Sequence, residues 1–275
     1  MTFDSYHWRR ATLGTPELER ARVLVSTTHD RASFALLLRS HDSAAVGIAL
    51  DQYQYGEATS RWGAPNPFAE YSAEVAARAR ATLREPAYPA TPQADAGANH
   101  ASALTALTNL FQPEDAGFIA ASLAHTPNGD LRNAATTAAG RVLEKASAPN
   151  IPLSAALGEI VAALEAMIFD DDLTSRERID ALGSLAYHAS THVTDVLLRV
   201  LECPDVKLQA HAALHLLARG EGVHRPAVER VARTWPAEPP CPADEVLEAL
   251  RDGDQQRLPT GDVGPLGCSA MTRDR

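Results

Sequence analysis

The sequence predicts an all-α fold, and three observations support this prediction. Short segments rich in alanine and leucine recur along the chain, with small or apolar residues spaced to cover one face of a helix. Connectors rich in Gly, Pro and Asn separate these segments and provide the expected stop signals. Long alternating apolar and polar runs rich in Val, Ile and Thr, which would indicate strands, are missing.

Four segments fit one helical template, with small or apolar residues at offsets 4, 5, 7 and 8 and at most one polar exception. They begin at Asn99, Leu131, Glu177 and Val206, so their starts lie 32, 46 and 29 residues apart. A second apolar helix is expected after each, over residues 115–124, 153–169, 191–201 and 227–235, and a short helix over 243–250. Pairs of helices at this spacing are typical of two-helix solenoid repeats.

Two of these segments carry a specific family pattern. Leu131-Arg132-Asn133-Ala134-Ala135-Thr136-Thr137-Ala138-Ala139-Gly140 and Val206-Lys207-Leu208-Gln209-Ala210-His211-Ala212-Ala213-Leu214 each follow an aspartate, Asp130 or Asp205. Here the chain resembles the HEAT-like repeat family, including its short bacterial relatives described as phycobilisome-lyase-like repeats. The resemblance covers residues 99–235 and extends back to about residue 31 in the same register. It departs at Asn99 and Glu177, where a polar residue replaces the opening hydrophobe.

The resemblance implies an irregular right-handed α-solenoid of stacked two-helix repeats. We expect one such domain over residues 1–251, with an aromatic-rich insertion at 51–98, followed by a flexible tail over 252–275. HEAT-like solenoids serve as scaffolds, adaptors, immunity proteins and a few enzymes, so the architecture by itself does not assign a function.

Charge and composition narrow the class of partner. The chain of 275 residues has 25 Lys and Arg against 35 Asp and Glu, a net charge of −10, which argues against a nucleic-acid partner. No apolar run is long enough to cross a membrane or to form a signal-peptide core. The three cysteines show no CxxC spacing. We therefore expect a cytoplasmic protein that binds no cofactor, with self-association left open.

The segment from Asp51 to Tyr71 holds five of the fifteen aromatic residues. Exposed aromatics supply much of the binding energy at protein interfaces, and loops inserted between repeats commonly line the binding face. We therefore name as candidate binding residues Tyr53, Tyr55, Arg61, Trp62, Phe68 and Tyr71. The alternative is that these side chains fold back as a local core over the first repeats.

Two histidine pairs are the weak metal candidates: His188 with His192, and His211 with His215, each four residues apart. That spacing puts two imidazoles on one helix face, within reach of one metal ion. However, neither pair encloses a glutamate, as in HExxH, and His188 and His192 are expected to straddle a turn. Packed or solvated histidines are the simpler interpretation, and we predict no metal site.

The sequence contains no GxSxG elbow, no GxxxxGK[ST] phosphate loop and no GxGxxG after a strand. The sequence thus favours a non-catalytic scaffold or adaptor that binds a protein through the concave face of the solenoid and the segment 51–71. The alternatives are a small enzyme, with a pocket beneath the aromatic segment or a histidine-based metal site, and a HEAT-like DNA glycosylase. The acidic net charge argues against the glycosylase.

Overall fold

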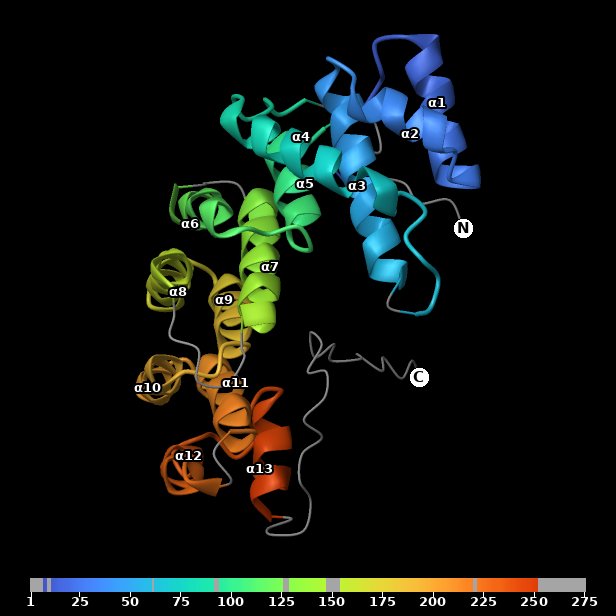
Figure 1. Ribbon diagram of the computed structural model, residues 1–275. Helices are drawn as coiled ribbons and strands as arrows, with labels where there is room; N and C mark the ends of the chain where they lie inside the picture. Colours follow the sequence, from blue (N-terminus) through green and yellow to red (C-terminus); the bar gives the residue numbers. More distant parts are fainter. Residues whose placement is uncertain are drawn as a thin grey trace, which may run out of the picture. The chain divides into compact units, whose positions relative to one another are not determined.

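The computed structural model describes residues 7–8, 11–60, 62–91, 94–125, 129–146, 154–219 and 222–251. Within these ranges the regular elements are thirteen α-helices and two short 3₁₀ helices, and the one β-type contact is an isolated bridge between Thr91 and Ala94 (Figure 1). The all-α prediction is confirmed. None of the described helices is long and apolar enough to cross a membrane.

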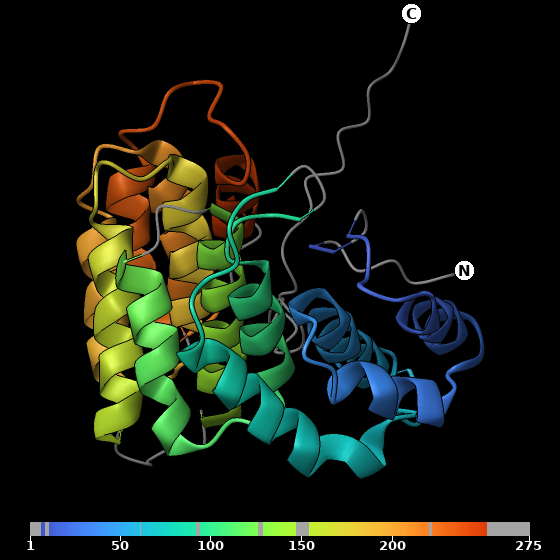
Figure 2. The ribbon, with the colours of Figure 1, turned by 90° about the horizontal axis from the view of Figure 1, so that it is seen from above.

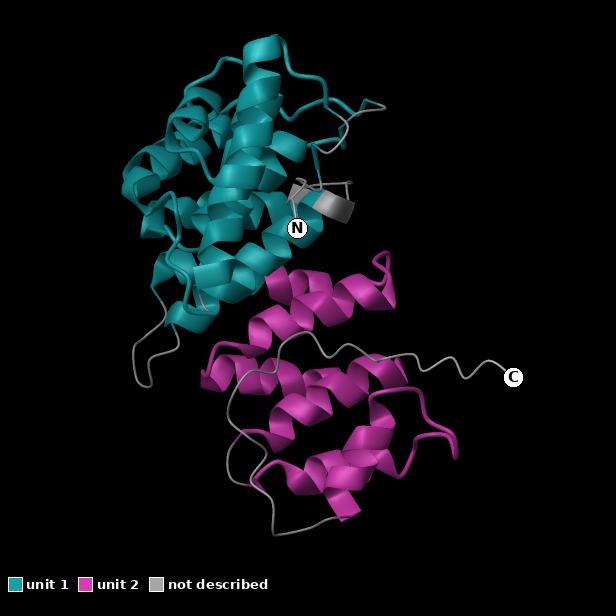
Figure 3. Cartoon of the chain, turned by 90° about the vertical axis from the view of Figure 1, so that its right-hand side faces the viewer, with its two compact units in different colours: residues 1–146, 151–163 teal, residues 147–150, 164–275 magenta. Residues whose placement is uncertain are grey.

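The chain divides into two compact units, coloured separately in Figure 3. Unit 1 comprises residues 1–146 and 151–163, and unit 2 comprises residues 147–150 and 164–275. The region predicted as one domain, 1–251, therefore contains two contact units, and its behaviour as one domain stays a prediction. The predicted tail, 252–275, lies outside the described residues.

Unit 1 is built around one central helix, α5. Its elements are α1 (Pro16–Thr28), α2 (Arg31–Leu38), α3 (Ser43–Ser60), η1 (Ala69–Tyr71), α4 (Ser72–Arg84), α5 (Ala98–Leu107), η2 (Pro113–Asp115), α6 (Ala116–His125), α7 (Gly129–Ala146) and the first part of α8 (Ala155–Ile168). Helix α5 packs against α3, α4 and α7. Its buried alanines at positions 98, 101, 103 and 106 let these three helices approach closely.

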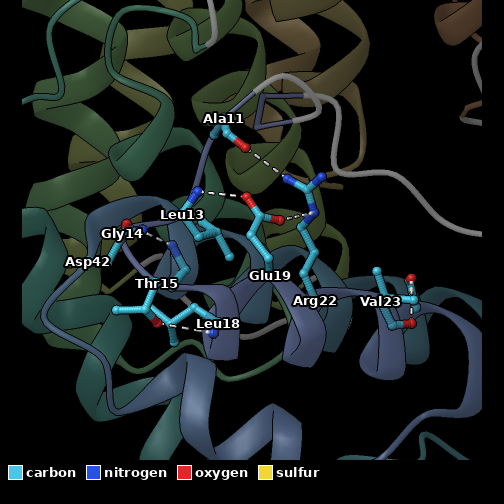
Figure 4. A network of polar contacts seen from close by, with 11 residues as sticks. Ala11, Leu13, Gly14, Thr15, Leu18, Glu19, Arg22, Val23 and Asp42 are labelled. Carbon is cyan, nitrogen blue, oxygen red and sulfur yellow. Dashed lines mark hydrogen bonds and ion pairs between the residues drawn. The ribbon is translucent and has the colours of Figure 1, made fainter.

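A polar network fixes the start of α1 (Figure 4). The Thr15 side chain accepts a hydrogen bond from the Leu18 amide at 3.2 Å, as an N-cap residue does. Glu19 accepts from the Leu13 amide at 2.8 Å and pairs with Arg22, which donates to the Ala11 carbonyl at 2.8 Å. These bonds hold the segment before α1 against the helix.

Trp8 occupies a socket in the core of unit 1. Its side chain is fully buried, and its indole Nε1 donates to Ser102 Oγ on α5 at 3.0 Å. Tyr88 packs against it edge-on, with ring centroids 5.0 Å apart. The socket depends on Gly47 of α3, because a Cβ there would lie 2.1 Å from Trp8 Nε1.

Unit 2 contains the end of α8 followed by α9 (Ser175–Ala186), α10 (Thr191–Val200), α11 (Val206–Leu217), α12 (Arg225–Ala232) and α13 (Ala243–Arg251). Helix α11 packs against α9, α10, α12 and α13. In Figure 1, α9, α11 and α13 lie in one row, and α10 and α12 lie in a second row beside it. Seen from above, the axes of these helices run side by side (Figure 2).

Polar side chains from later helices cap the carboxyl ends of earlier ones in unit 2. Arg178 of α9 donates through Nε to the Ile168 carbonyl at the end of α8, at 2.8 Å. Gln209 of α11 donates to the Leu201 carbonyl after α10, at 3.1 Å. Arg219, just after α11, donates to the Ala186 carbonyl at the end of α9. Each bond satisfies a carbonyl that its own helix leaves unpaired.

The sequence located most helices correctly. The four template segments correspond to α5, α7, α9 and α11, and the expected second helices to α6, α8, α10 and α12. The aromatic segment 51–71, which the sequence assigns to an insertion between repeats, is helical in its first half, because residues 51–60 continue α3. Burial of Tyr53 on the inner side of α3 favours the helix there, although Gly56 has low helix propensity.

Candidate functional site

The second half of the aromatic segment forms a loop that leaves α3 and returns to η1. We call residues 62–68 the Trp62 loop. It begins with two backbone hydrogen bonds, from the Trp62 amide to the Thr59 carbonyl and from the Gly63 amide to the Ser60 carbonyl, both 3.0 Å. Gly63 has φ of +94°, a conformation that other residues rarely adopt, so a glycine is required at this turn.

Asn66 fastens the other end of the Trp62 loop to α3. Its Nδ2 donates to Glu57 Oε1 at 2.6 Å and to the Tyr53 carbonyl at 3.3 Å, and its Oδ1 accepts from the Phe68 amide at 2.9 Å. The side chain fits only because residue 56 is glycine, since a Cβ there would lie 2.3 Å from Asn66 Oδ1. The loop is therefore anchored at both ends.

Beyond the loop, aromatic rings pack against α2. Phe68 stacks on Phe34 with centroids 4.1 Å apart, and His29 lies edge-on to Phe68. Tyr71 packs against Phe34 at 5.2 Å, and its hydroxyl donates to the Arg31 carbonyl at 3.3 Å. This part of the segment is a local core that joins η1 to α2.

The structure thus separates the predicted binding residues into groups. Tyr53 and Phe68 are buried, so an anchor role that requires exposure does not fit them, and the local-core interpretation applies. Tyr55 and Tyr71 are half-buried. Trp62 is 85% exposed, and Arg61 lies outside the described residues. One predicted aromatic anchor remains fully available to a partner.

The exposure of Trp62 is exceptional within this molecule. Among the described residues, the other large hydrophobic side chains that are exposed are Val23, Leu24, Leu36 and Val223, and the most exposed of these, Val223, reaches 74%. Water-exposed apolar surface on a tryptophan has no folding benefit, and tryptophan is the residue most enriched at interface hot spots.

Tyr53 is a structural rather than a reactive group. Burial, together with the negative charge of Glu57, raises the pKa of Tyr53 to about 12. Its phenol therefore stays protonated at neutral pH and offers no base or nucleophile beneath the aromatic segment.

The histidine pairs are arranged as the sequence indicated. His188 lies in the turn after α9, whereas His192 lies on α10, so this pair does straddle a turn. His192 Nε2 lies 2.9 Å from Glu165 Oε2, and Arg199 donates to Oε1 of the same carboxylate at 2.6 Å. His192 thus belongs to an ion-pair cluster on the surface of unit 2.

His211 and His215 share one face of α11. Burial lowers the pKa of both imidazoles, and that of His215 falls to about 4 with a further contribution from the Arg219 charge. In the described part of the chain, no group of three or more His, Cys, Asp and Glu side chains is arranged to hold a metal ion. The hypothesis of a histidine-based metal site receives no support from this geometry.

The structure also identifies functional residues that the sequence analysis missed. Asn66 holds the Trp62 loop, and the segment Gly-Ala-Pro-Asn-Pro after Trp62 is a turn signal that points to this anchoring. Arg219 follows His215 at the same four-residue spacing that separates His211 from His215. This repeated four-residue spacing places His211, His215 and Arg219 along one side of α11 and its end.

The comparisons with known proteins give no family. No protein-family model matches the chain, and no curated protein matches its sequence.

Proposed function

We propose that this chain is a non-catalytic scaffold of the HEAT-like α-solenoid type, which acts in the cytoplasm and binds a protein partner with Trp62 as the anchor. The observation that carries the proposal is a tryptophan 85% exposed on a loop fastened at both ends. The concave face that stacked helix pairs create would supply the surrounding contact area.

Anchoring matters for affinity because binding costs the entropy of every group that it orders. The Trp62 loop is already held by its bonds to Thr59 and Ser60 and by the Asn66 side chain. A partner therefore gains the burial of the indole with little further ordering of the backbone. This is the preorganisation that distinguishes a binding loop from a mobile connector.

The two rows of helices in unit 2 support the solenoid part of the proposal. Helices that alternate between an inner and an outer row are the arrangement of two-helix repeats. The alanine-rich template segments α9 and α11 both lie in one row, and α10 and α12 both lie in the other.

The test is affinity capture from the native cytosol, followed by titration of the captured protein. Full-length chain is compared with Trp62→Ala and with the control Val223→Ala, which truncates a 74% exposed side chain in unit 2. We expect a stoichiometric partner with wild type and the control, and an affinity for Trp62→Ala weaker by a factor of about 30 or more, the effect typical of a hot spot.

Thermal unfolding accompanies this test. Because Trp62 is exposed, we expect Trp62→Ala to melt at the wild-type temperature, whereas a large decrease would make the residue structural. A partner that Trp62→Ala binds as tightly as wild type does, or the absence of any enriched protein, would overturn the proposal. A third variant, Asn66→Ala, frees the loop while keeping the indole, and we expect an intermediate loss of affinity.

A further inference from the structure

A second site, independent of the Trp62 loop, lies in unit 2 where α9 ends. The Arg219 guanidinium donates through Nη2 to the Ala186 carbonyl and, at 2.9 Å, to the His188 carbonyl. Both carbonyls lie at the negative end of the α9 dipole, so Arg219 caps this helix. The cap uses one arm of the guanidinium.

The other arm has no acceptor. Arg219 Nη1 and His188 Nδ1 are both buried, and neither has a hydrogen-bond partner in the structure. The His188 side chain as a whole is only 5% exposed. Within the described ranges no carboxylate forms an ion pair with Arg219, and burial lowers the pKa of its guanidinium. A buried cationic donor without an acceptor is costly, so an acceptor here would be strongly favoured.

Arg178 forms a similar helix cap, and in that cap the second donor of the guanidinium also has an acceptor. Arg178 caps α8 through Nε and the Ile168 carbonyl, and its Nη1 donates to Asp171 Oδ1 at 2.9 Å. Arg178 and Arg219 therefore each use part of the guanidinium to satisfy a helix end, through Nε in Arg178 and Nη2 in Arg219. They differ in that a carboxylate of the chain satisfies the second arm of Arg178. By analogy, a carboxylate oxygen is the acceptor that suits the second arm of Arg219.

The imidazoles near Arg219 are uncharged at neutral pH, so Arg219 carries the positive charge of this cluster. His211, His215 and Arg219 follow one stripe of α11 and its end at four-residue spacing. Burial, and then the Arg219 charge, lowers the pKa of His188 and of His215, so both rings are neutral at pH 7. Asp180 and Asp205 act on His211, at the far end of the stripe. An anion would therefore meet one unpaired positive charge beside a neutral imidazole.

We propose that Arg219 and His188 bind a small free carboxylate, with one oxygen accepting from Arg219 Nη1 and the other from the Nδ1–H of His188. A carboxylate has two oxygens, so it can accept from both donors at once. The burial of both atoms favours an ion of the size of formate or acetate over the acidic side chain of a protein.

The test is a titration of the full-length chain with sodium formate and sodium acetate, followed by NMR of the histidine ring and arginine side-chain signals. Sodium chloride at matched ionic strength is the control, and inorganic phosphate is a separate arm. We expect saturable shifts of the His188 and Arg219 signals with the carboxylates and none with chloride. The pKa of His188 should rise in the complex, because the bound anion stabilises the imidazolium.

Two variants remove the site in different ways. Arg219→Lys keeps a cationic donor for the Ala186 carbonyl but lacks the second arm, and His188→Phe keeps a ring but lacks Nδ1. Each should weaken carboxylate binding by a factor of about ten or more, the effect of one lost hydrogen bond to a charged group. Arg178→Lys weakens the similar cap on α8, and Arg233→Lys makes the same replacement at an exposed position of unit 2. Both controls should retain wild-type affinity.

Several outcomes would overturn the proposal. These are an absence of saturable shifts in the wild-type chain, equal shifts with chloride, saturation by phosphate alone, or wild-type affinity in Arg219→Lys. Because His188→Phe leaves the arginine cap intact, the proposal stays testable even if the Arg219 variant unfolds.

Discussion

At the scale of single residues, polar side chains that bind backbone groups explain where the repeats depart from their template. Asn99 opens α5 in place of a hydrophobe and is only 2% exposed. Its Oδ1 accepts from the Tyr88 amide at 2.8 Å, and its Nδ2 donates to the Pro86 carbonyl at 3.0 Å. Glu177 forms a capping box with Thr174 at the start of α9. Each polar residue thus satisfies backbone groups that a leucine would leave unpaired.

The Trp8 socket gives a prediction at the same scale. In Gly47→Ala the new methyl group would overlap the indole, so Trp8 or α3 has to move. Overpacking of this kind costs about 1–3 kcal/mol of unfolding free energy. Urea unfolding measures the loss, and near-UV circular dichroism reports the displaced indole.

Gly183→Ala is the matched control, because Gly183 also lies within a helix but a Cβ there would meet nothing within 4 Å. Replacing it by alanine should stabilise the chain by about 0.5–1 kcal/mol through helix propensity. If Gly47→Ala proved as benign as this control, the packing assigned to Trp8 would be incorrect.

At the scale of helices, unit 2 is joined by side chains that satisfy the ends of neighbouring helices. Gln209 is the clearest example, because it donates to the Leu201 and Cys203 carbonyls, at 3.1 and 2.6 Å, and accepts from Trp235 Nε1 at 2.7 Å. One buried amide therefore connects the end of α10, helix α11 and Trp235, which follows α12. Such connections hold helices in register where apolar packing alone would let them slide.

We predict that Gln209→Leu destabilises unit 2 although it adds apolar volume. Two carbonyls and one indole N–H would lose their partner, at a cost of about 1–3 kcal/mol for each group that stays buried. Hydrogen exchange should become faster in α10 and α11. Lys207→Met, an exposed change on the same helix, is the control and should leave exchange unaltered; equal protection in the two variants would refute the role of the amide.

At the scale of the whole molecule, three buried or half-buried histidines predict how stability depends on pH. Burial lowers the pKa of His188, His211 and His215, the last to about 4, from an ordinary value near 6.5. The unfolded chain therefore binds more protons than the folded chain between these values. Stability should be fully present above pH 6.5 and should fall as the pH decreases toward 4.

Melting temperatures measured across this range check the prediction. His215→Gln removes the group with the largest of these shifts and should flatten the pH dependence. An unchanged slope in His215→Gln would show that this imidazole does not contribute to the acid sensitivity.

Helix positions were predictable because they depend on local spacing. The template at Val206 located α11, and Asp205 before it is indeed the N-cap that accepts from the Lys207 and Leu208 amides. The helical template did not locate α1, which buries only Ala21 and Val25.

The sequence by itself determined the helical class, the places of the repeated helix pairs and the gathering of aromatic residues before residue 72. Only the tertiary structure decided which of those aromatics a partner can reach. Phe68 is buried because Phe34 on α2 stacks against it, and Trp62 is exposed because Asn66 draws the rest of the loop back to α3. Periodicity reports neighbours within one helix, whereas burial depends on contacts between segments that are distant in the chain.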